Sequence, residues 1–225
     1  MSVAQPHIAP FGDSALLVAW PERIDPAINE RVHALAQLIR AERRSGAAWL
    51  SPVPAYASLL APYDPLRLSA VEAESRLGHM LAEVSAGTPA ATDHLPLLEI
   101  PVHYGGEEGP DLETVAERTG LSPASVIELH TAQTYRAYLL CFAPGFAYLG
   151  TLSPELHLPR RATPRQRVPA GSVGIAAAQT AVYPLSTAGG WHLLGRTELG
   201  LWDIERDPPA LIRPGQQVRF LRAAG

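Results

Sequence analysis

Proline and glycine divide the stretch from Cys141 to Asp203 into short segments, and this spacing is the strongest constraint on how the chain folds. The segments between them are apolar or β-branched, as in residues 172–178 and 191–194. Runs of this kind, cut at close intervals by Pro and Gly, are typical of short strands joined by tight turns rather than of helices. The stretch therefore predicts a β-rich region.

Four arginines lie within eight residues of this stretch, bracketed by Pro159, Pro164 and Pro169. They are Arg160, Arg161, Arg165 and Arg167. Because prolines at this spacing forbid a helix, we expect the arginines to lie on an extended loop. Guanidinium groups bind carboxylate or phosphate through paired hydrogen bonds, and fixed backbone angles lower the cost of ordering the loop. On composition alone, an anion-binding loop and a solvated charged loop are equally good interpretations.

The composition is that of an ordinary globular protein, with 225 residues, 47% hydrophobic and 18% charged. This length allows one large domain or two small ones. A net charge of −4 gives no general attraction to nucleic acid or to an anionic membrane. The single cysteine, Cys141, cannot form an internal disulfide, which fits a reducing compartment. Without a signal-peptide pattern or an apolar run of about eighteen residues, we expect a cytoplasmic protein.

All 18 basic residues are arginine, and the chain contains no lysine. A Walker-A phosphate loop, a kinase-type site and Schiff-base chemistry each need a lysine. All three are excluded if the chain acts alone. The base composition of the gene accounts for most of the bias, but the exclusion holds whatever its origin.

Residues 1–90 predict a small α+β domain of order β-α-β-β-α, with helices on one face of a sheet. The expected strands are residues 14–20, 47–53 and 56–61. Asp25 and Pro26 open a helix with one apolar face. Ser69 and Glu72 form a capping box for a second helix that ends near Ala86. We expect no catalytic residue in this domain.

The segment Gly87–Asp93 is small, polar and without periodicity, so we place the domain boundary there and expect domains at 1–90 and 91–225. Residues 97–104 predict a strand. A helical pair is expected at 111–132, with Asp111 and Ser122 as N-caps and Gly120 between the helices. The pair also has the spacing of a DNA-binding helix-turn-helix, but its second helix carries no arginine, so a packed pair is favoured.

The remaining sequence predicts a series of short strands. They are residues 135–142, 172–178, 181–183, 191–194, 199–204 and 217–221. Many short strands with few helices indicate a closed or nearly closed β-barrel in residues 91–225.

Two other kinds of site are disfavoured. The segment Ala170–Gly174 resembles a nucleophile elbow around Ser172, but His192 precedes Asp203, which is the wrong order for the partners of such a serine, so a tight turn is favoured. The eight histidines are dispersed and only one cysteine is present, so we expect no metal site.

The arginine loop and several residues after it combine anion-binding groups, amide and hydroxyl donors and an aromatic wall. These later residues are Ser172, Gln179, Thr180, Trp191, Arg196 and Thr197. Such a mixture suits a small polar amide or carboxylate ligand. His130 is a weaker acid–base candidate, because a buried histidine bonded to the backbone is the commoner case.

A specific order of residue types runs through the second half of the chain. It comprises Phe142, Pro144-Gly145-Phe146, Tyr148-Leu149-Gly150, Pro159-Arg160-Arg161, Pro164-Arg165, Val168–Ile175, Gln179-Thr180, Tyr183-Pro184, Gly189-Gly190-Trp191 and Gly195-Arg196-Thr197. This order resembles the family of 5-oxoprolinase B subunits, also known as KipI-like or allophanate hydrolase subunit 1. The chain departs from the family pattern at Cys141, Ala177, Ala181 and Ala188, where Gly, Gly, Gly and Pro are expected. These departures concern the turn near Gln179, because Ala adopts positive φ poorly.

The resemblance implies an α+β protein, in which a small N-terminal α/β sandwich-type domain is followed by a cyclophilin-like β-barrel domain. It implies the B subunit of an ATP-dependent 5-oxoprolinase, a hydrolase that converts 5-oxo-L-proline to L-glutamate together with two partners, an A subunit and a carboxyltransferase-like C subunit. ATP, with magnesium, is then expected to bind in the complex and not to this chain alone. For this reaction we expect Arg160, Arg161 and Arg165 to bind anions, and Gln179, Thr180 and Arg196 to position the substrate.

The resemblance also implies two alternatives. The chain is then either an inhibitor of a sensor histidine kinase or a partner of a urea carboxylase-like enzyme that acts on another amide. The inhibitor would be an interaction module that binds the dimerisation helices of the kinase, with exposed Phe146, Tyr148 and Trp191 as anchors.

The predicted boundary can be tested by limited proteolysis. Cleavage within Gly87–Asp93 should release two halves that each keep a folded circular-dichroism spectrum, because each domain has its own core. Progressive loss of all structure after cleavage would show that the boundary is wrong.

Overall fold

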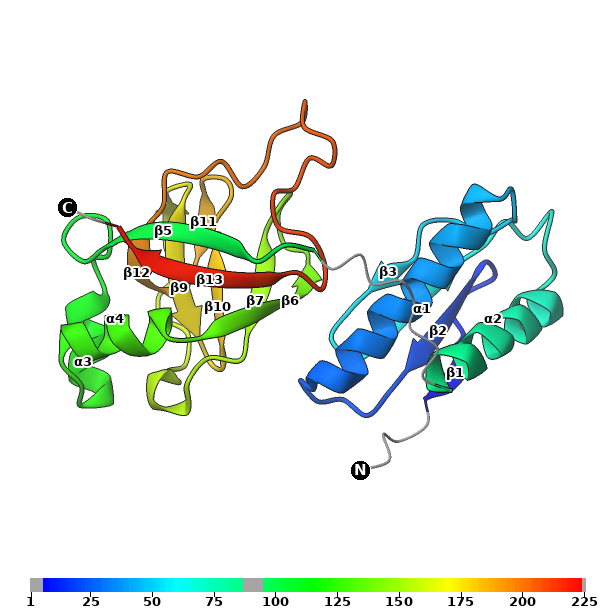
Figure 1. The fold of residues 1–225 in the computed structure, drawn as a ribbon, viewed down its shortest axis with the longest axis horizontal. Coiled ribbons are helices and arrows are strands. Elements are labelled where there is room, and N and C mark those ends of the chain that lie inside the picture. The colour runs from blue at the N-terminus through cyan, green and yellow to red at the C-terminus, as the bar shows by residue number, and fades with distance from the viewer. Residues whose placement is uncertain (1–5, 87–94, 224–225) are drawn as a thin grey trace. The chain divides into compact units, whose positions relative to one another are not determined.

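The computed structural model describes residues 6–86 and 95–223 (Figure 1). Contacts within the chain divide it into two compact units, Met1–His94 and Leu95–Gly225. The predicted linker Gly87–Asp93 lies outside the described residues, so the predicted domain limits stay a prediction. None of the helices in residues 6–86 and 95–223 has the length and hydrophobicity of a membrane span.

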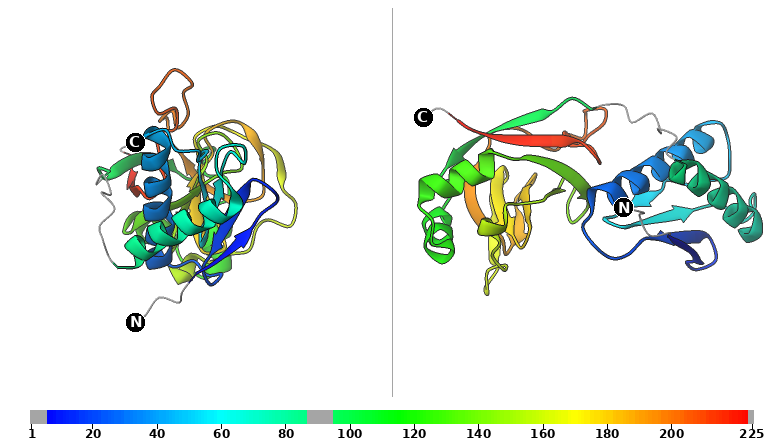
Figure 2. Two further views of the ribbon diagram at one scale, coloured as in Figure 1. Left: turned by 90° about the vertical axis from the view of Figure 1, so that its right-hand side faces the viewer. Right: turned by 60° about the horizontal axis from the view of Figure 1, so that its bottom comes forward.

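The first unit is a four-stranded antiparallel sheet with two helices on one face (Figure 2). The strands, in the sheet order β1-β2-β4-β3, are β1 (His7–Pro10), β2 (Ala15–Ala19), β4 (Ser58–Pro62) and β3 (Val53–Pro54). The helices are α1 (Pro26–Arg44) and α2 (Ala70–Ser85). Alternate strand residues such as Leu16, Val18 and Leu59 are buried in the core that the sheet shares with the helices.

Local side chains start both helices as the sequence predicts. The Asp25 carboxylate accepts hydrogen bonds from the backbone N–H groups of Ala27 and Ile28, at 2.9 and 3.3 Å. Ser69 and Glu72 form the predicted capping box. These two predictions are confirmed.

The strand predictions for this unit are only partly right. The run at 47–53 is wrong as a continuous strand. Trp49 makes only an isolated bridge, to Tyr63, and only Val53–Pro54 forms a strand, because prolines lack the N–H that a ladder needs. Strand β1 was missed, since it is only four residues long and ends in a proline. The pairing of β1 with β2 depends on tertiary contacts, which the hydrophobic periodicity of the sequence does not predict.

The second unit is built on a closed barrel of seven strands, which confirms the predicted barrel and fits a cyclophilin-like fold. In barrel order, its strands are β10 (Gln179–Val182), β7 (Ala147–Gly150), β6 (Thr134–Leu140), β13 (Gln217–Arg222), β5 (Leu98–Tyr104), β12 (His192–Arg196) and β9 (Ser172–Ala176). The β5–β13 pair is parallel and the other neighbours are antiparallel. The predicted strand at 199–204 is wrong, since only Trp202 in it makes an isolated bridge, to Ala210.

The barrel strands carry apolar side chains on both faces. Residues such as Val173, Leu194 and Val182 belong to the large core, whereas Phe146, Leu193 and Ala181 belong to a separate cluster. Because successive residues of a strand point to opposite faces, the large cluster fills the barrel and the smaller one lies on its outside. The arginine stretch contributes a short ribbon to the outside, in which β8 (Arg165–Val168) pairs with β11 (Thr187–Gly189).

Helices α3 (Leu112–Thr119) and α4 (Pro123–Thr131) pack against each other and against the barrel. Val115, Ala116, Val126 and Ile127 are buried in the large core, so these faces are not free for DNA. The packed helical pair is confirmed. A single 3₁₀ turn, η1, covers Pro154–Leu156.

Gly109 is required where the turn before α3 meets β12. A Cβ atom built on Gly109 would lie 2.0 Å from the carbonyl oxygen of Leu194, which is backbone and cannot move aside. We therefore expect Gly109→Ala to lower the free energy of unfolding by about 1–3 kcal/mol, the usual cost of overpacking, as measured by urea unfolding. The matched control is Gly200→Ala, where nothing lies within 4 Å of the added atom. Equal stabilities of the two variants would contradict this reading of the turn.

Candidate functional site

Asp111 is the centre of the candidate site, although it was expected only to cap a helix. Its side chain is 4% exposed and makes no capping hydrogen bond. Instead, Oδ1 accepts from Arg161 Nη1 at 2.7 Å and from Arg165 Nη2 at 2.8 Å, while Oδ2 accepts from Arg165 Nη1 at 2.8 Å. Asp111 therefore occupies the predicted N-cap position of α3, but its carboxylate binds the two guanidinium groups and does not cap the helix.

The backbone of β12 fixes Asp111 from the other side. The N–H of Leu193 donates to Asp111 Oδ2 at 2.7 Å, and the N–H of Asp111 donates to the Leu193 carbonyl at 3.0 Å. Burial raises the pKa of Asp111, but the hydrogen bonds from Arg165 and Leu193 and the charges of both arginines outweigh it and hold the pKa below its usual value. The carboxylate is therefore ionised at neutral pH and compensates one of the two positive charges.

The arginine loop is fastened to the barrel at further points. The N–H of Arg161 donates to the Gly190 carbonyl at 2.8 Å, and His192 Nε2 donates to the Pro159 carbonyl at 3.0 Å. The side chains of Arg161 and Arg165 are only 31% and 24% exposed. The solvated-loop interpretation is therefore wrong for these two arginines, whereas Arg160 and Arg167 are exposed as a solvated loop would have them.

A pocket of about 250 Å³, here called the arginine pocket, lies beside this cluster. It is lined by Glu107, Glu108, Pro110, Arg165, Arg167, Pro169, Ser172, Leu193 and Arg196. Arg196 is held by a hydrogen bond from Nε to the Ala170 carbonyl at 2.9 Å, and its Nη1 lies 3.5 Å from Glu108 Oε2. Three predicted site residues, Arg165, Ser172 and Arg196, therefore meet at one pocket, and Arg167 joins them.

His130 and Thr180 lie elsewhere, in the barrel interior, and both are fully buried. Thr180 Oγ1 donates to the Gly174 carbonyl at 3.1 Å, so it accepts from His130 Nε2 at 2.8 Å. His130 Nδ1 then accepts from the Tyr104 hydroxyl at 2.7 Å. Burial lowers the pKa of His130 to about 3, so the ring is neutral, and this placement favours a structural role over acid–base catalysis.

The other predicted residues are dispersed around the barrel. Trp191 is buried and stands edge-on to Phe146 and Tyr148, with ring centroids 5.8 Å apart in each pair. Thr197 is buried, and its hydroxyl accepts from the N–H of Leu199. Gln179 is half-buried at the start of β10 and does not line the arginine pocket. The expectation that Phe146 and Trp191 are exposed is wrong, since they are 2% and 5% exposed.

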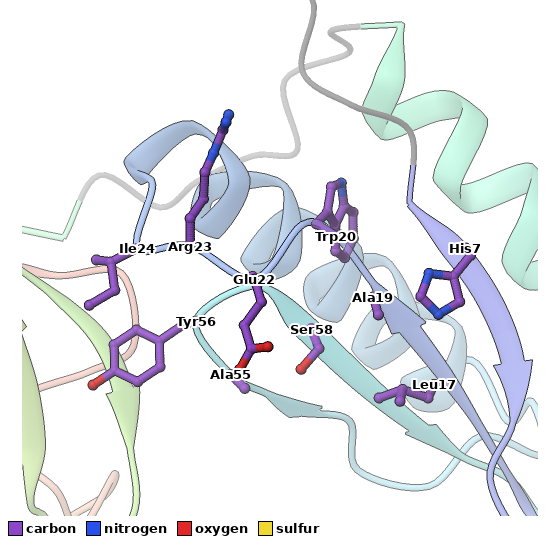
Figure 3. Close-up of a pocket in the computed structure, with 11 residues that line it drawn as sticks. His7, Leu17, Ala19, Trp20, Glu22, Arg23, Ile24, Ala55, Tyr56 and Ser58 are labelled. Carbon is purple, nitrogen blue, oxygen red and sulfur yellow. The ribbon is translucent and has the colours of Figure 1, made fainter.

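A second pocket, of about 660 Å³, belongs to the first unit (Figure 3). Leu17, Ala19 and Ser58 of the sheet lie along it, and Trp20, Tyr56 and Ile24 give it further apolar walls. Its arginine, Arg23, is paired with Asp25 at 2.8 Å. None of the predicted site residues lines this pocket, and its walls offer no charged group comparable to the arginine cluster.

Asp111 was not among the predicted site residues, although it is the partner of the arginines. Fifty positions separate Asp111 from Arg161, so local patterns cannot connect them. A signal was nevertheless present, because a proline-bracketed arginine cluster that packs on a barrel needs a carboxylate to compensate its charge. Among the residues that the structure describes, no group of three or more His, Cys, Asp or Glu side chains could hold a metal ion.

Comparison with known sequences gives matches along nearly the whole chain. Residues 6–212 match the family model described as carboxyltransferase domain, subdomain C and D. The 5-oxoprolinase B subunit of Bacillus subtilis (strain 168) is 42% identical over 226 residues, which covers 96% of this chain and 92% of the relative. The 5-oxoprolinase B subunit of Escherichia coli O157:H7 is 42% identical over 211 residues, covering 94% and 93%.

Solved structures agree with these matches. The uncharacterised protein PH0987 from Pyrococcus horikoshii is 44% identical, with 96% of this chain and 97% of that chain covered and a TM-score of 0.55. The protein TTHA0988 is 40% identical with a TM-score of 0.78, and 94% of this chain spans only 40% of its length. The Kluyveromyces lactis urea carboxylase is 16% identical with a TM-score of 0.70, over 97% of this chain and 22% of that one, and shares the fold alone.

The neutrality of His130 can be tested through stability. An unfolded histidine binds a proton near pH 6.5 and the folded one only near pH 3, so below pH 6.5 the unfolded state binds more protons and the free energy of unfolding falls as the pH falls. We expect His130 to contribute a loss of about 2 kcal/mol between pH 7.5 and pH 5. Urea unfolding at both pH values should show this loss in the native protein, and His130→Gln should lack it. The same pH dependence in both proteins would contradict the assignment.

Proposed function

Because this chain belongs to the carboxyltransferase-domain family (subdomains C and D), together with bacterial proteins named as 5-oxoprolinase B subunits, we propose that it is the B subunit of an ATP-dependent 5-oxoprolinase. In this role it converts 5-oxo-L-proline to L-glutamate together with an A subunit and a carboxyltransferase-like C subunit. The observation that carries the proposal is the 42% identity to the Bacillus subtilis protein, which extends over 96% of this chain.

The arginine pocket gives this proposal a physical basis. The substrate carries a carboxylate and a lactam carbonyl, and both are hydrogen-bond acceptors. Arg165, Arg196 and Ser172 present donors around one small cavity. Fixed guanidinium groups bind a carboxylate well and also stabilise negative charge that develops on a carbonyl oxygen.

The reaction needs ATP because resonance stabilises the planar C–N bond of the lactam. Transfer of the terminal phosphoryl group of ATP to the carbonyl oxygen releases ADP and activates the carbonyl carbon. One water adds to that carbon and the C–N bond breaks, which gives a ring-opened acyl phosphate, and a second water hydrolyses this to the carboxylate and phosphate. This chain has no lysine, and the part of it that the structure describes has no acidic or histidine cluster for a metal ion. We therefore assign ATP and its magnesium ion to the partner subunits, and the complex to the cytoplasm, where ATP is supplied.

The kinase-inhibitor alternative has lost its structural support. It depended on Phe146, Tyr148 and Trp191 as exposed anchors. Phe146 and Trp191 are buried in the cluster outside the barrel, and Tyr148 is half-buried. The likeness to urea carboxylase is one of fold, so it gives no reason to prefer another amide as the substrate.

A reconstituted complex tests the proposal. We expect Arg165→Ala to reduce ATP-dependent ring opening of 5-oxo-L-proline by about 10- to 100-fold in folded complex, because a charge-assisted hydrogen bond to the substrate contributes about 1.5–3 kcal/mol. The exposed Arg213 supplies the control, and Arg213→Ala should keep full turnover. Retained turnover in Arg165→Ala would remove that residue from the site.

The isolated chain provides a second test of the same proposal. If ATP binds to the partners, the pure protein should hydrolyse no ATP, as measured by phosphate release with and without 5-oxo-L-proline. Measurable ATP hydrolysis by the pure chain would overturn the dependence on partners.

A further inference from the structure

We propose that the arginine pocket is the subsite for the substrate carboxylate and that Asp111 is its positioning residue, which presents Arg165 to that group. The inference rests on the proposed function, since 5-oxo-L-proline is a small molecule with one carboxylate. Asp111 is buried and touches no ligand itself, but it fixes the orientation of Arg165, which does.

The hydrogen bonds of Arg165 leave part of its guanidinium group free for a ligand. A guanidinium has five N–H donors. Asp111 accepts one hydrogen from Nη1 and one from Nη2, both at 2.8 Å. This end-on pairing leaves Nε–H and one hydrogen on each terminal nitrogen for other acceptors. Since Arg165 also lines the pocket, a carboxylate there can be bound by donors that Asp111 does not use.

The geometry of Arg165 is fixed before any ligand arrives. Asp111 is itself held by Arg161 and by the backbone N–H of Leu193, and residues Arg165–Val168 form strand β8. A long, flexible side chain normally loses rotamer freedom when it binds a ligand, and this loss weakens binding. Here the buried carboxylate of Asp111 already holds Arg165 in one conformation. Asp111 therefore strengthens ligand binding without touching the ligand.

The charges around the pocket favour a single negative charge. Four arginines lie in or beside it, namely Arg161, Arg165, Arg167 and Arg196. Three carboxylates oppose them, namely Glu107, Glu108 and Asp111. Four positive charges against three negative ones leave one positive charge in excess, which a monocarboxylate compensates. The volume of about 250 Å³ is below the range of drug-sized pockets and suits a small molecule.

A purely structural ion pair would behave differently from a positioning residue. If Asp111 only stabilised the fold, its substitution would lower the free energy of unfolding and leave the affinity of the folded protein unchanged. If it positions Arg165, affinity for a carboxylate falls in protein that is still folded. Ligand affinity and stability must therefore be measured on the same samples.

The experiment uses the full chain, labelled with ¹⁵N, and follows the arginine Nε–H signals by NMR. The two probes are 5-oxo-L-proline and 2-pyrrolidinone, which has the same lactam ring without the carboxylate. We expect 5-oxo-L-proline to shift the signals of Arg165 and Arg196 in a saturable way, and 2-pyrrolidinone to leave them unchanged.

Two variants test the role of Asp111. Asp111→Asn should raise the dissociation constant for 5-oxo-L-proline by about tenfold or more, which is the scale of one lost charge-assisted hydrogen bond. The exposed Asp203, whose carboxylate accepts from the N–H of Glu205 in a turn, gives the matched control Asp203→Asn, with no change expected. Should Asp111→Asn fail to fold, Arg165→Lys keeps the charge but loses the paired geometry, and it should weaken binding in the same way.

Each outcome has a definite meaning. No saturable shift in the native chain, or equal shifts with 2-pyrrolidinone, would overturn the carboxylate subsite. Unchanged affinity in Asp111→Asn, or in folded Arg165→Lys, would overturn the positioning role. Turnover of the reconstituted complex is assayed separately. Turnover without binding at this pocket would refute the subsite and leave the proposed function standing, whereas binding without turnover would refute the function alone.

Discussion

The buried contact between Asp111 and two arginines is the interaction on which the second unit depends. It joins the turn before α3 to a loop 50 positions later and to the backbone of β12. A carboxylate that is removed from water is costly unless it is fully paired, and this one accepts four hydrogen bonds from three residues. Loss of Asp111 would break this buried ion pair and leave both guanidinium groups without their counter-ion, at a cost of about 3–5 kcal/mol. The arginine loop therefore owes its shape to a carboxylate far away in the sequence.

Sequence alone predicted the features that are decided locally. The helix starts at Asp25 and Ser69, the end of α3 at Gly120 and the packed helical pair all depend on residues within a few positions of one another. The arginine cluster was predicted for the same reason, because its four members lie within eight residues of the sequence. The partner of those arginines was not predicted, because pairing across the fold follows from topology. Residues 199–204 show the opposite failure, since an apolar run with strand character makes only an isolated bridge, between Trp202 and Ala210.

One of the four departures from the family pattern, Ala177, coincides with an unusual backbone conformation, and a second departure, Cys141, precedes another. Ala177, where the pattern has Gly, adopts a φ of 50°, and Phe142, next to Cys141, adopts a φ of 76°. A left-handed conformation costs a non-glycine residue about 1–2 kcal/mol. The β9–β10 pairing and the hydrogen bond from the N–H of Ala177 to the Leu158 carbonyl hold the first of these residues in place. The turn near Gln179 is thus retained without its glycine, because the surrounding strands determine its path.

The parallel pair of β5 and β13 has a consequence for biosynthesis. Strand β13 lies between β5 and β6, yet it is the last strand of the unit to leave the ribosome. Until β13 has been synthesised, β5 and β6 lack the strand that lies between them. Their open edges are then exposed to unwanted pairing with other nascent chains. Closure of the barrel must wait until β13 has been synthesised, so this unit cannot mature piece by piece from its amino end.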